Sequence, residues 1–183
     1  MGKMDTCAWE FYSDPARYAD LVNGLIFQGQ QVVSAHDIHV LDSRSGEKVR
    51  DLLRQVAFEE NIATIGIENQ TYVDYAMSQR VMLYEACEYD RQKELIKKEI
   101  GKKRKGLSSD EYLGRFGMNN RLNAHVTIIL YYGKRSWNGA ENLTEIIDFH
   151  GIPEAFQKLV QNYRTHVVEI RKLKDTSVFK TDV

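Results

Sequence analysis

Apolar residues recur at helical spacing across residues 14–29. The apolar stripe comprises Tyr18, Leu21, Val22, Leu25 and Ile26. Asp14 and Pro15 stand where the N-cap and the first helical residue belong, and Gly29 follows the stripe where helices commonly end. The pattern therefore predicts a helix over this segment.

Four segments carry the β-branched or alternating apolar residues that are typical of strands. They are 31–42, 61–70, 123–133 and 166–173. A fifth segment, 47–58, is ambiguous, because its apolar positions match a helical period as well as a strand. If it is a strand, the short polar link around Glu59 and Glu60 joins it to the next strand as a hairpin. Residues 42–48 are predicted to form the preceding turn.

Helical patterns dominate the rest of the chain. The predicted helices are a long one over 78–103, a short one over 106–117 with a capping-type start, and two more over 138–149 and 152–164. Strands followed by a long helix and a further core strand predict a layered α/β or α+β domain.

Composition and charge narrow the class of protein. The 183 residues suit one domain, expected to span residues 1–183. No run approaches the ~20 apolar residues that span a membrane, and the N-terminus lacks the apolar core of a signal peptide. Two cysteines are too few for a disulfide framework, which indicates a reducing cytoplasm. With a net charge of −1, contact with nucleic acid would require a local concentration of positive charge.

The segment 61–70 ends with a carboxylate and an amide on one face, because Glu68 and Gln70 are two residues apart in a predicted strand. In the hairpin arrangement, the residue opposite Glu68 is Asp51. Two carboxylates about 5 Å apart repel by about 3 kcal/mol at an effective dielectric constant of about 20. A shared proton, a cationic side chain or a divalent metal would offset this repulsion. If 47–58 is a helix instead, the two carboxylates lie apart and Glu68 is a solvated strand end.

Four stretches of the chain are together similar to one known family. They read "YADLVNGLIFQGQQVV", "VRDLL", "IGIENQTYVDYAMSQRVMLYEACEYDRQ" and "VTIILYYGKRSWNGA". They resemble the recombination-promoting nuclease (Rpn) or YhgA-like transposase family of the PD-(D/E)XK nuclease superfamily, over most of the chain. The resemblance implies a nuclease-like α/β fold with a central mixed sheet flanked by helices, and it favours a strand over 49–55. Because family members often continue further, a missing C-terminal extension stays open.

The resemblance also implies a function, that of a metal-dependent DNA endonuclease acting in recombination or transposition. By resemblance, Asp51 and Glu68 take the places of the two catalytic acids, and Gln70 takes the place of a lysine. The implied cofactor is Mg²⁺ or Mn²⁺, held by these acids and the backbone carbonyl of Asn69. The metal would activate a water that Gln70 positions. Glutamine in the lysine place keeps an alternative open, a catalytically weak nuclease-fold module for DNA binding or protein interaction.

Three further residues are candidate accessories of this site: Asp20, Arg80 and Tyr84. The resemblance implies that Asp20 joins the metal site, whereas the helical pattern makes it a solvated flank of an amphipathic helix. Arg80 and Tyr84 are four residues apart and share one face of the long helix. Either they brace the site and contact a DNA phosphate, or Arg80 pairs with a carboxylate and Tyr84 packs in the core.

A basic run near the end of the long helix is the only concentrated positive charge in the sequence. Its basic residues are Lys97, Lys98, Lys102, Lys103, Arg104 and Lys105. Contacts with DNA phosphates would make the affinity fall steeply with salt, whereas a solvated helix end is the alternative. DNA is therefore the predicted partner, a homodimer stays open, and no membrane partner is expected.

Overall fold

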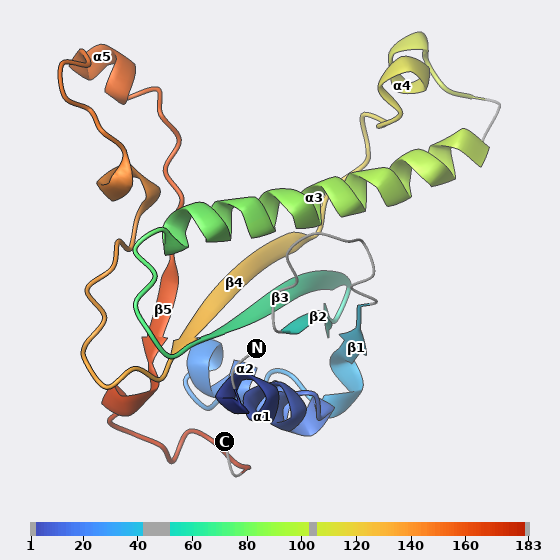
Figure 1. Ribbon diagram of the computed structural model, residues 1–183. Helices are drawn as coiled ribbons and strands as arrows, with labels where there is room; N and C mark the ends of the chain where they lie inside the picture. The colour runs from blue at the N-terminus through green and yellow to red at the C-terminus, as the bar shows by residue number, and fades with distance from the viewer. Residues whose placement is uncertain (1–2, 42–51, 103–105, 182–183) are drawn as a thin grey trace.

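The computed structural model describes residues 3–41, 52–102 and 106–181, which form a five-stranded mixed sheet with helices on its faces (Figure 1). The strands lie in the order β1-β2-β3-β4-β5. Their bounds are Ile38–Val40 for β1, Leu52–Phe58 for β2, Asn61–Gln70 for β3, Ala124–Tyr131 for β4 and His166–Glu169 for β5. The predicted α/β architecture with a mixed sheet flanked by helices is confirmed, and the nuclease-like assignment stays a prediction.

Strands β2 and β3 form the predicted antiparallel hairpin, so the ambiguous segment is a strand over the residues described. The prediction that residue 68 faces residue 51 requires Leu52 to pair with Ile67, and these two residues do pair. Asp51 itself lies outside the described residues, so its pairing with Glu68 stays a prediction. The turn predicted over 42–48 lies outside them too.

Helices lie on both faces of the sheet. Their bounds are Lys3–Tyr12 for α1, Pro15–Phe27 for α2, Met77–Lys102 for α3, Ser109–Gly114 for α4 and Glu154–Gln157 for α5. Helices α1 and α2 lie against one face, and α3 crosses the other (Figure 1). Strands β3, β4 and β5 are parallel, and α3 is the crossover between β3 and β4. None of the helices in these ranges is long and apolar enough to cross a membrane.

The main hydrophobic core lies between the sheet and α2. Tyr18, Leu21 and Val22 of α2 are buried and belong to one cluster with Ile65 and Ile67 of β3. The Tyr18 hydroxyl also donates to the Ile65 carbonyl at 2.9 Å. These three helix residues belong to the predicted apolar stripe, so burial of that stripe orients α2 on the sheet.

Helix α2 begins and ends at the predicted signals. The Asp14 carboxylate accepts hydrogen bonds from the backbone N–H groups of Ala16 and Arg17 at 2.8 and 3.0 Å. After the helix the chain adopts a left-handed conformation, with φ of 86° at Gly29, which glycine tolerates without a steric penalty. The predicted helix is therefore confirmed.

The strand predicted over 31–42 is wrong in most of its length, because among residues 31–41, which the structure describes, only the three residues of β1 form a paired strand. Before β1, the backbone of Val33 is bonded to the side chain of Asn23 on α2. The Asn23 amide donates to the Val33 carbonyl at 2.7 Å and accepts from the Val33 N–H at 2.9 Å. Asp37 then accepts from the backbone N–H and hydroxyl of Ser34 at 2.8 and 2.7 Å, which favours a 3-10 turn. Side-chain bonds with the backbone therefore replace sheet pairing here.

The two helices predicted over 138–149 and 152–164 are also wrong in most of their length. The helical residues there are a 3-10 helix, Leu143–Ile146, and the four residues of α5. Asn162 accepts from the backbone N–H and hydroxyl of Thr144 at 3.1 and 3.2 Å, so the two segments are tied to each other. The predicted α3 and β4 are confirmed, whereas α4 and β5 cover only half of 106–117 and 166–173, and Ile170–Lys172 is a 3-10 helix.

Candidate functional site

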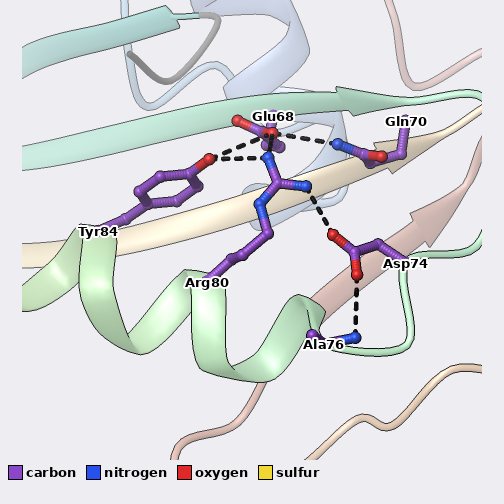
Figure 2. Close-up of polar contacts among 6 residues, drawn as sticks. All are labelled: Glu68, Gln70, Asp74, Ala76, Arg80 and Tyr84. Carbon is purple, nitrogen blue, oxygen red and sulfur yellow. Dashed lines mark hydrogen bonds and ion pairs between the residues drawn. The ribbon is translucent and has the colours of Figure 1, made fainter. Parts of the chain in front are cut away.

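Strand β3 presents two polar side chains toward α3. Glu68 and Gln70 share one face, whereas Ile65 and Ile67 belong to the core on the α2 side. Gln70 Nε2 donates to Glu68 Oε1 at 3.0 Å (Figure 2). Glu68 is 4% exposed and Gln70 is 5% exposed. The predicted shared face is confirmed, and the alternative of a solvated strand end is wrong.

Arg80 of α3 is the cationic partner of this carboxylate. Its Nη2 donates to Glu68 Oε1, and its Nη1 donates to Asp74 Oδ2 at 2.8 Å (Figure 2). Asp74 is itself fixed just before the helix, because its Oδ1 accepts from the backbone N–H of Ala76 at 2.9 Å. A cationic side chain, one of the three predicted means, therefore offsets the charge of Glu68.

Tyr84 lies one turn beyond Arg80 and completes the network. Its hydroxyl accepts from Arg80 Nη2 at 2.8 Å and donates to Glu68 Oε1 at 3.5 Å. Burial alone would lower the pKa of Arg80, but hydrogen bonds with Asp74 and Tyr84 and the charge of Glu68 raise that pKa above its usual value. The predicted alternative in which Arg80 pairs with a carboxylate and Tyr84 is buried is confirmed. Contact with a DNA phosphate stays a prediction.

The side-chain carbonyl oxygen of Gln70 could accept a further hydrogen bond or bind a cation. The atom is buried and has no hydrogen-bond partner among the residues that the structure describes. A buried polar atom without a partner costs about 1–3 kcal/mol, so a water, a donor or a cation beside it would be stabilising. Hard cations such as Mg²⁺ bind oxygen atoms of carboxylates, amides and water. Glu68 and Gln70 supply such oxygens, and their chemistry fits a hard cation.

The remaining predicted metal ligands are only partly placed. Asp51 lies outside the described residues. Asn69 follows Glu68 on β3, and its side chain lines a cavity of about 280 Å³ on the opposite face, together with Phe11, Tyr12 and Tyr132. The predicted role of Asn69 concerns its backbone carbonyl and stays a prediction. Within 3–41, 52–102 and 106–181, no three His, Cys, Asp or Glu side chains are grouped so as to hold a metal.

Asp20 is not the solvated flank that the helical pattern predicted. It is 4% exposed. Its carboxylate accepts from the backbone N–H groups of Lys180 and Thr181 at 2.6 to 2.9 Å. The prediction fails because residues about 160 positions further along the chain cover this flank of α2, which a local pattern cannot report. The accessory role of Asp20 at a metal stays a prediction.

The described residues of the basic run lie on a part of α3 distant from Glu68. Lys97, Lys98 and Lys102 are near the end of α3, and the interval from Arg80 to Lys97 corresponds to about 25 Å along a helix. Lys97 Nζ pairs with Glu94 at 2.8 Å, whereas Lys98 and Lys102 are exposed. The other members, Lys103, Arg104 and Lys105, lie outside the described residues. The predicted DNA contact therefore concerns a surface separate from the Glu68 network.

A second buried polar cluster under α3 lies outside the sequence-based predictions. Glu88 accepts from Arg91 at 2.7 and 2.8 Å, from Gln92 at 3.0 Å and from the Thr64 hydroxyl at 3.3 Å. Burial acts to raise the pKa of Glu88, but the bonds from Arg91 and Gln92 and the charge of Arg91 bring it below its usual value. The sequence does contain a signal for this cluster, because Tyr84, Glu88 and Gln92 recur every four residues on one helix face.

The chain was compared with protein-family models, curated proteins and solved structures. No family model matches the chain, and neither a curated protein nor a solved structure matches it. The functional interpretation therefore depends on the contacts around Glu68 and on the resemblance of the sequence motifs.

Proposed function

We propose that the chain is a metal-dependent DNA endonuclease that hydrolyses phosphodiester bonds. The observation that supports this proposal is the buried pair of Glu68 and Gln70, in which the amide oxygen has no partner among the described residues. The pair lies on a hairpin strand whose predicted register brings Asp51 opposite Glu68. The resemblance to the nuclease family assigns catalysis to the same three positions.

In the proposed site, Asp51, Glu68 and the backbone carbonyl of Asn69 hold Mg²⁺ or Mn²⁺. The bound ion supplies the charge that lowers the pKa of a coordinated water and stabilises the charge on the phosphate. Gln70 Nε2 donates to Glu68, which fixes the amide so that its Oε1 faces away from that bond. This oxygen accepts a hydrogen bond from the attacking water and positions it.

Arg80 has a positioning role in this proposal. Its guanidinium stabilises the ionised form of Glu68, and the ionised carboxylate is the form that binds a metal. Asp74 and Tyr84 hold the guanidinium from two further directions. Arg80 therefore acts through Glu68 rather than on the phosphate.

One observation favours a second candidate function, a nuclease-fold module that binds DNA or a protein without strong catalysis. Arg80 already neutralises Glu68 in the folded chain, so the charge of this carboxylate does not by itself require a metal. Glutamine in the place of the family's lysine supports the same alternative, because the amide carries no charge to stabilise a phosphate.

Nicking of a supercoiled plasmid in Mg²⁺ tests the proposal. We expect Asp51→Ala and Glu68→Gln to lower the nicking rate by about hundredfold or more, and EDTA to abolish nicking. Glu10→Gln is the matched control, because Glu10 is an exposed carboxylate on α1, away from the basic run. Full-rate nicking by Asp51→Ala or in EDTA would contradict the proposal.

A thermal-shift assay separates the two candidate functions. For the endonuclease, Mg²⁺ or Mn²⁺ raises the melting temperature of the wild type but not that of Asp51→Ala, because binding to the native state stabilises it. Salt-sensitive DNA binding with neither a metal-dependent shift nor cleavage supports the binding module instead.

A further inference from the structure

Residues 176–181 bind helix α2 through the carboxylate of Asp20. Both carboxylate oxygens accept from the Lys180 N–H, at 2.8 and 2.9 Å, and Oδ2 also accepts from the Thr181 N–H at 2.6 Å. The Thr181 hydroxyl donates to Oδ2 at 2.8 Å. Hydrogen bonds to an ionised acceptor are roughly twice as strong as neutral ones. Asp20 therefore recognises two consecutive backbone N–H groups, which can reach one carboxylate because the segment turns at Ser177 and Val178 and bends at Lys180 and Thr181.

The aromatic ring of Phe179 occupies a slot that exists because Gly24 has no side chain. A Cβ atom at Gly24 would lie 2.2 Å from Phe179 Cε1. Glycine inside a helix costs about 1 kcal/mol relative to alanine, so the ring contact is a physical reason for glycine at this position. Gly24 is one turn after Asp20 on α2, so the slot and the carboxylate form one continuous site.

Outside this site, Val178 packs against Gly29 and the Phe179 ring lies against the main hydrophobic core. Thr176, Ser177, Lys180 and Thr181 are exposed, and only Val178 and Phe179 are partly buried. The segment forms no helix and no strand. Segments with few buried contacts open locally at a small fraction of the global stability.

We propose that Asp20 and Gly24 form a peptide-binding site on α2, which residues 176–181 occupy within their own chain and which accepts the same sequence from a second copy. The ligand is a segment with a turn before a phenylalanine, followed by two consecutive backbone N–H donors in a bent conformation. A segment attached to its own site has an effective concentration in the millimolar range, so the intramolecular form prevails in dilute solution. Exchange between copies requires the intramolecular contact to be weakened or the protein to be concentrated.

The test uses the full chain with Phe179→Ala, which empties the slot and leaves Asp20 intact. The probe is a fluorescein-labelled peptide of residues 174–181, amidated at its end so that no terminal carboxylate lies near Asp20. By fluorescence anisotropy, we expect at least about tenfold tighter binding to Phe179→Ala than to the wild type, whose own segment competes. A peptide with alanine in place of phenylalanine should bind at least about tenfold more weakly, because it cannot fill the slot.

The double variant Phe179→Ala with Gly24→Ala is the matched control for folding. Alanine favours the helical conformation of α2, but its methyl group fills the slot. We expect this variant to bind the peptide at least about tenfold more weakly than Phe179→Ala does. Equal affinity for the two variants, or no binding to Phe179→Ala, would overturn the proposal.

Amide hydrogen exchange tests the carboxylate separately. In Asp20→Asn, we expect the amides of Lys180 and Thr181 to exchange at least about tenfold faster than in the wild type, because the bonds to an ionised acceptor are lost. The amides of β3 serve as an internal reference and should keep their protection. Unchanged exchange at both amides would show that Asp20 does not hold the segment.

Discussion

Arg80 of α3 binds the buried carboxylate of Glu68 on β3, so one ion pair ties the long helix to the central strand of the sheet. The side chain of Arg80 is 26% exposed, whereas that of Glu68 is 5% exposed. The same carboxylate is therefore a structural anchor and the proposed metal ligand. Its two roles can be separated by measuring stability as well as activity.

Arg80→Ala is expected to lower the free energy of unfolding by about 3 kcal/mol, because it leaves a buried carboxylate without its cationic partner. Urea denaturation at neutral pH measures the loss. Lys158→Ala is the control, because Lys158 is 71% exposed in its ion pair with Glu154. Exposed pairs contribute less than about 1 kcal/mol. A loss for Arg80→Ala no larger than that of the control would contradict the anchoring role.

The Glu88 cluster predicts how stability depends on pH. The pKa of Glu88 is lowered in the folded chain, although burial opposes the bonds from Arg91 and Gln92. A lowered carboxyl pKa contributes stability above the unfolded pKa of about 4.3, and this contribution is lost as the pH falls through the folded pKa. Glu88→Gln should therefore be less stable than the wild type at neutral pH and lose less stability on acidification. Glu99→Gln, on the exposed side of the same helix, should retain the wild-type acid dependence.

Helix α2 could be predicted because its signals are local, whereas the β2–β3 hairpin could be predicted only on the condition that 47–58 is a strand. Asp14 acts on the N–H groups of the first helical turn, and the short link after β2 leaves a hairpin as the compact connection between two strands. The period of 47–58 could not decide between helix and strand. Pairing with β3 decides it for the residues described, and pairing is a tertiary contact that a periodic pattern does not contain.

Asp20 and Asp74 show why the sites were harder to predict. The partners of Asp20 are at positions 180 and 181, so its burial depends on the folded path of the whole chain. Asp74 does carry a local signal, because its carboxylate caps the Ala76 N–H just before α3. Its bond with Arg80 depends in addition on the helix turning that side chain back over Glu68. Single site residues can be proposed from the sequence, but identifying the residues that they bond to requires the structure.

The basic run predicts a salt dependence of DNA binding. If Lys98 and Lys102 each contact a phosphate, replacing both by alanine should reduce the slope of log K against log salt by about 2, at about 0.9 per contact. Filter binding at several salt concentrations measures the slope. Lys158 and Lys174 are exposed lysines on other elements, and their double alanine variant is the control. Equal slopes for the wild type and Lys98→Ala/Lys102→Ala would assign the run to a solvated helix end.

Gln70→Glu tests metal binding without relying on cleavage. The new carboxylate would lie beside Glu68, because the Gln70 amide is now 3.0 Å from it. Two carboxylates so close repel by about 5 kcal/mol at an effective dielectric constant of about 20, so the variant should melt below the wild type in EDTA at neutral pH. If the two oxygens bind a hard cation, millimolar Mg²⁺ should restore most of the loss, because the ion offsets the repulsion and binds the native state.

Gln70→Met is the control for this rescue, because it removes the amide at nearly constant volume and adds no charge. Its melting temperature should respond to Mg²⁺ less than that of the wild type, since the oxygen that holds the water beside the ion is missing. Acidification should also rescue Gln70→Glu without metal, because one proton shared between the carboxylates relieves the repulsion. Rescue by acid but not by Mg²⁺ would show that the pair does not bind a hard cation, and the binding-module function would then be favoured.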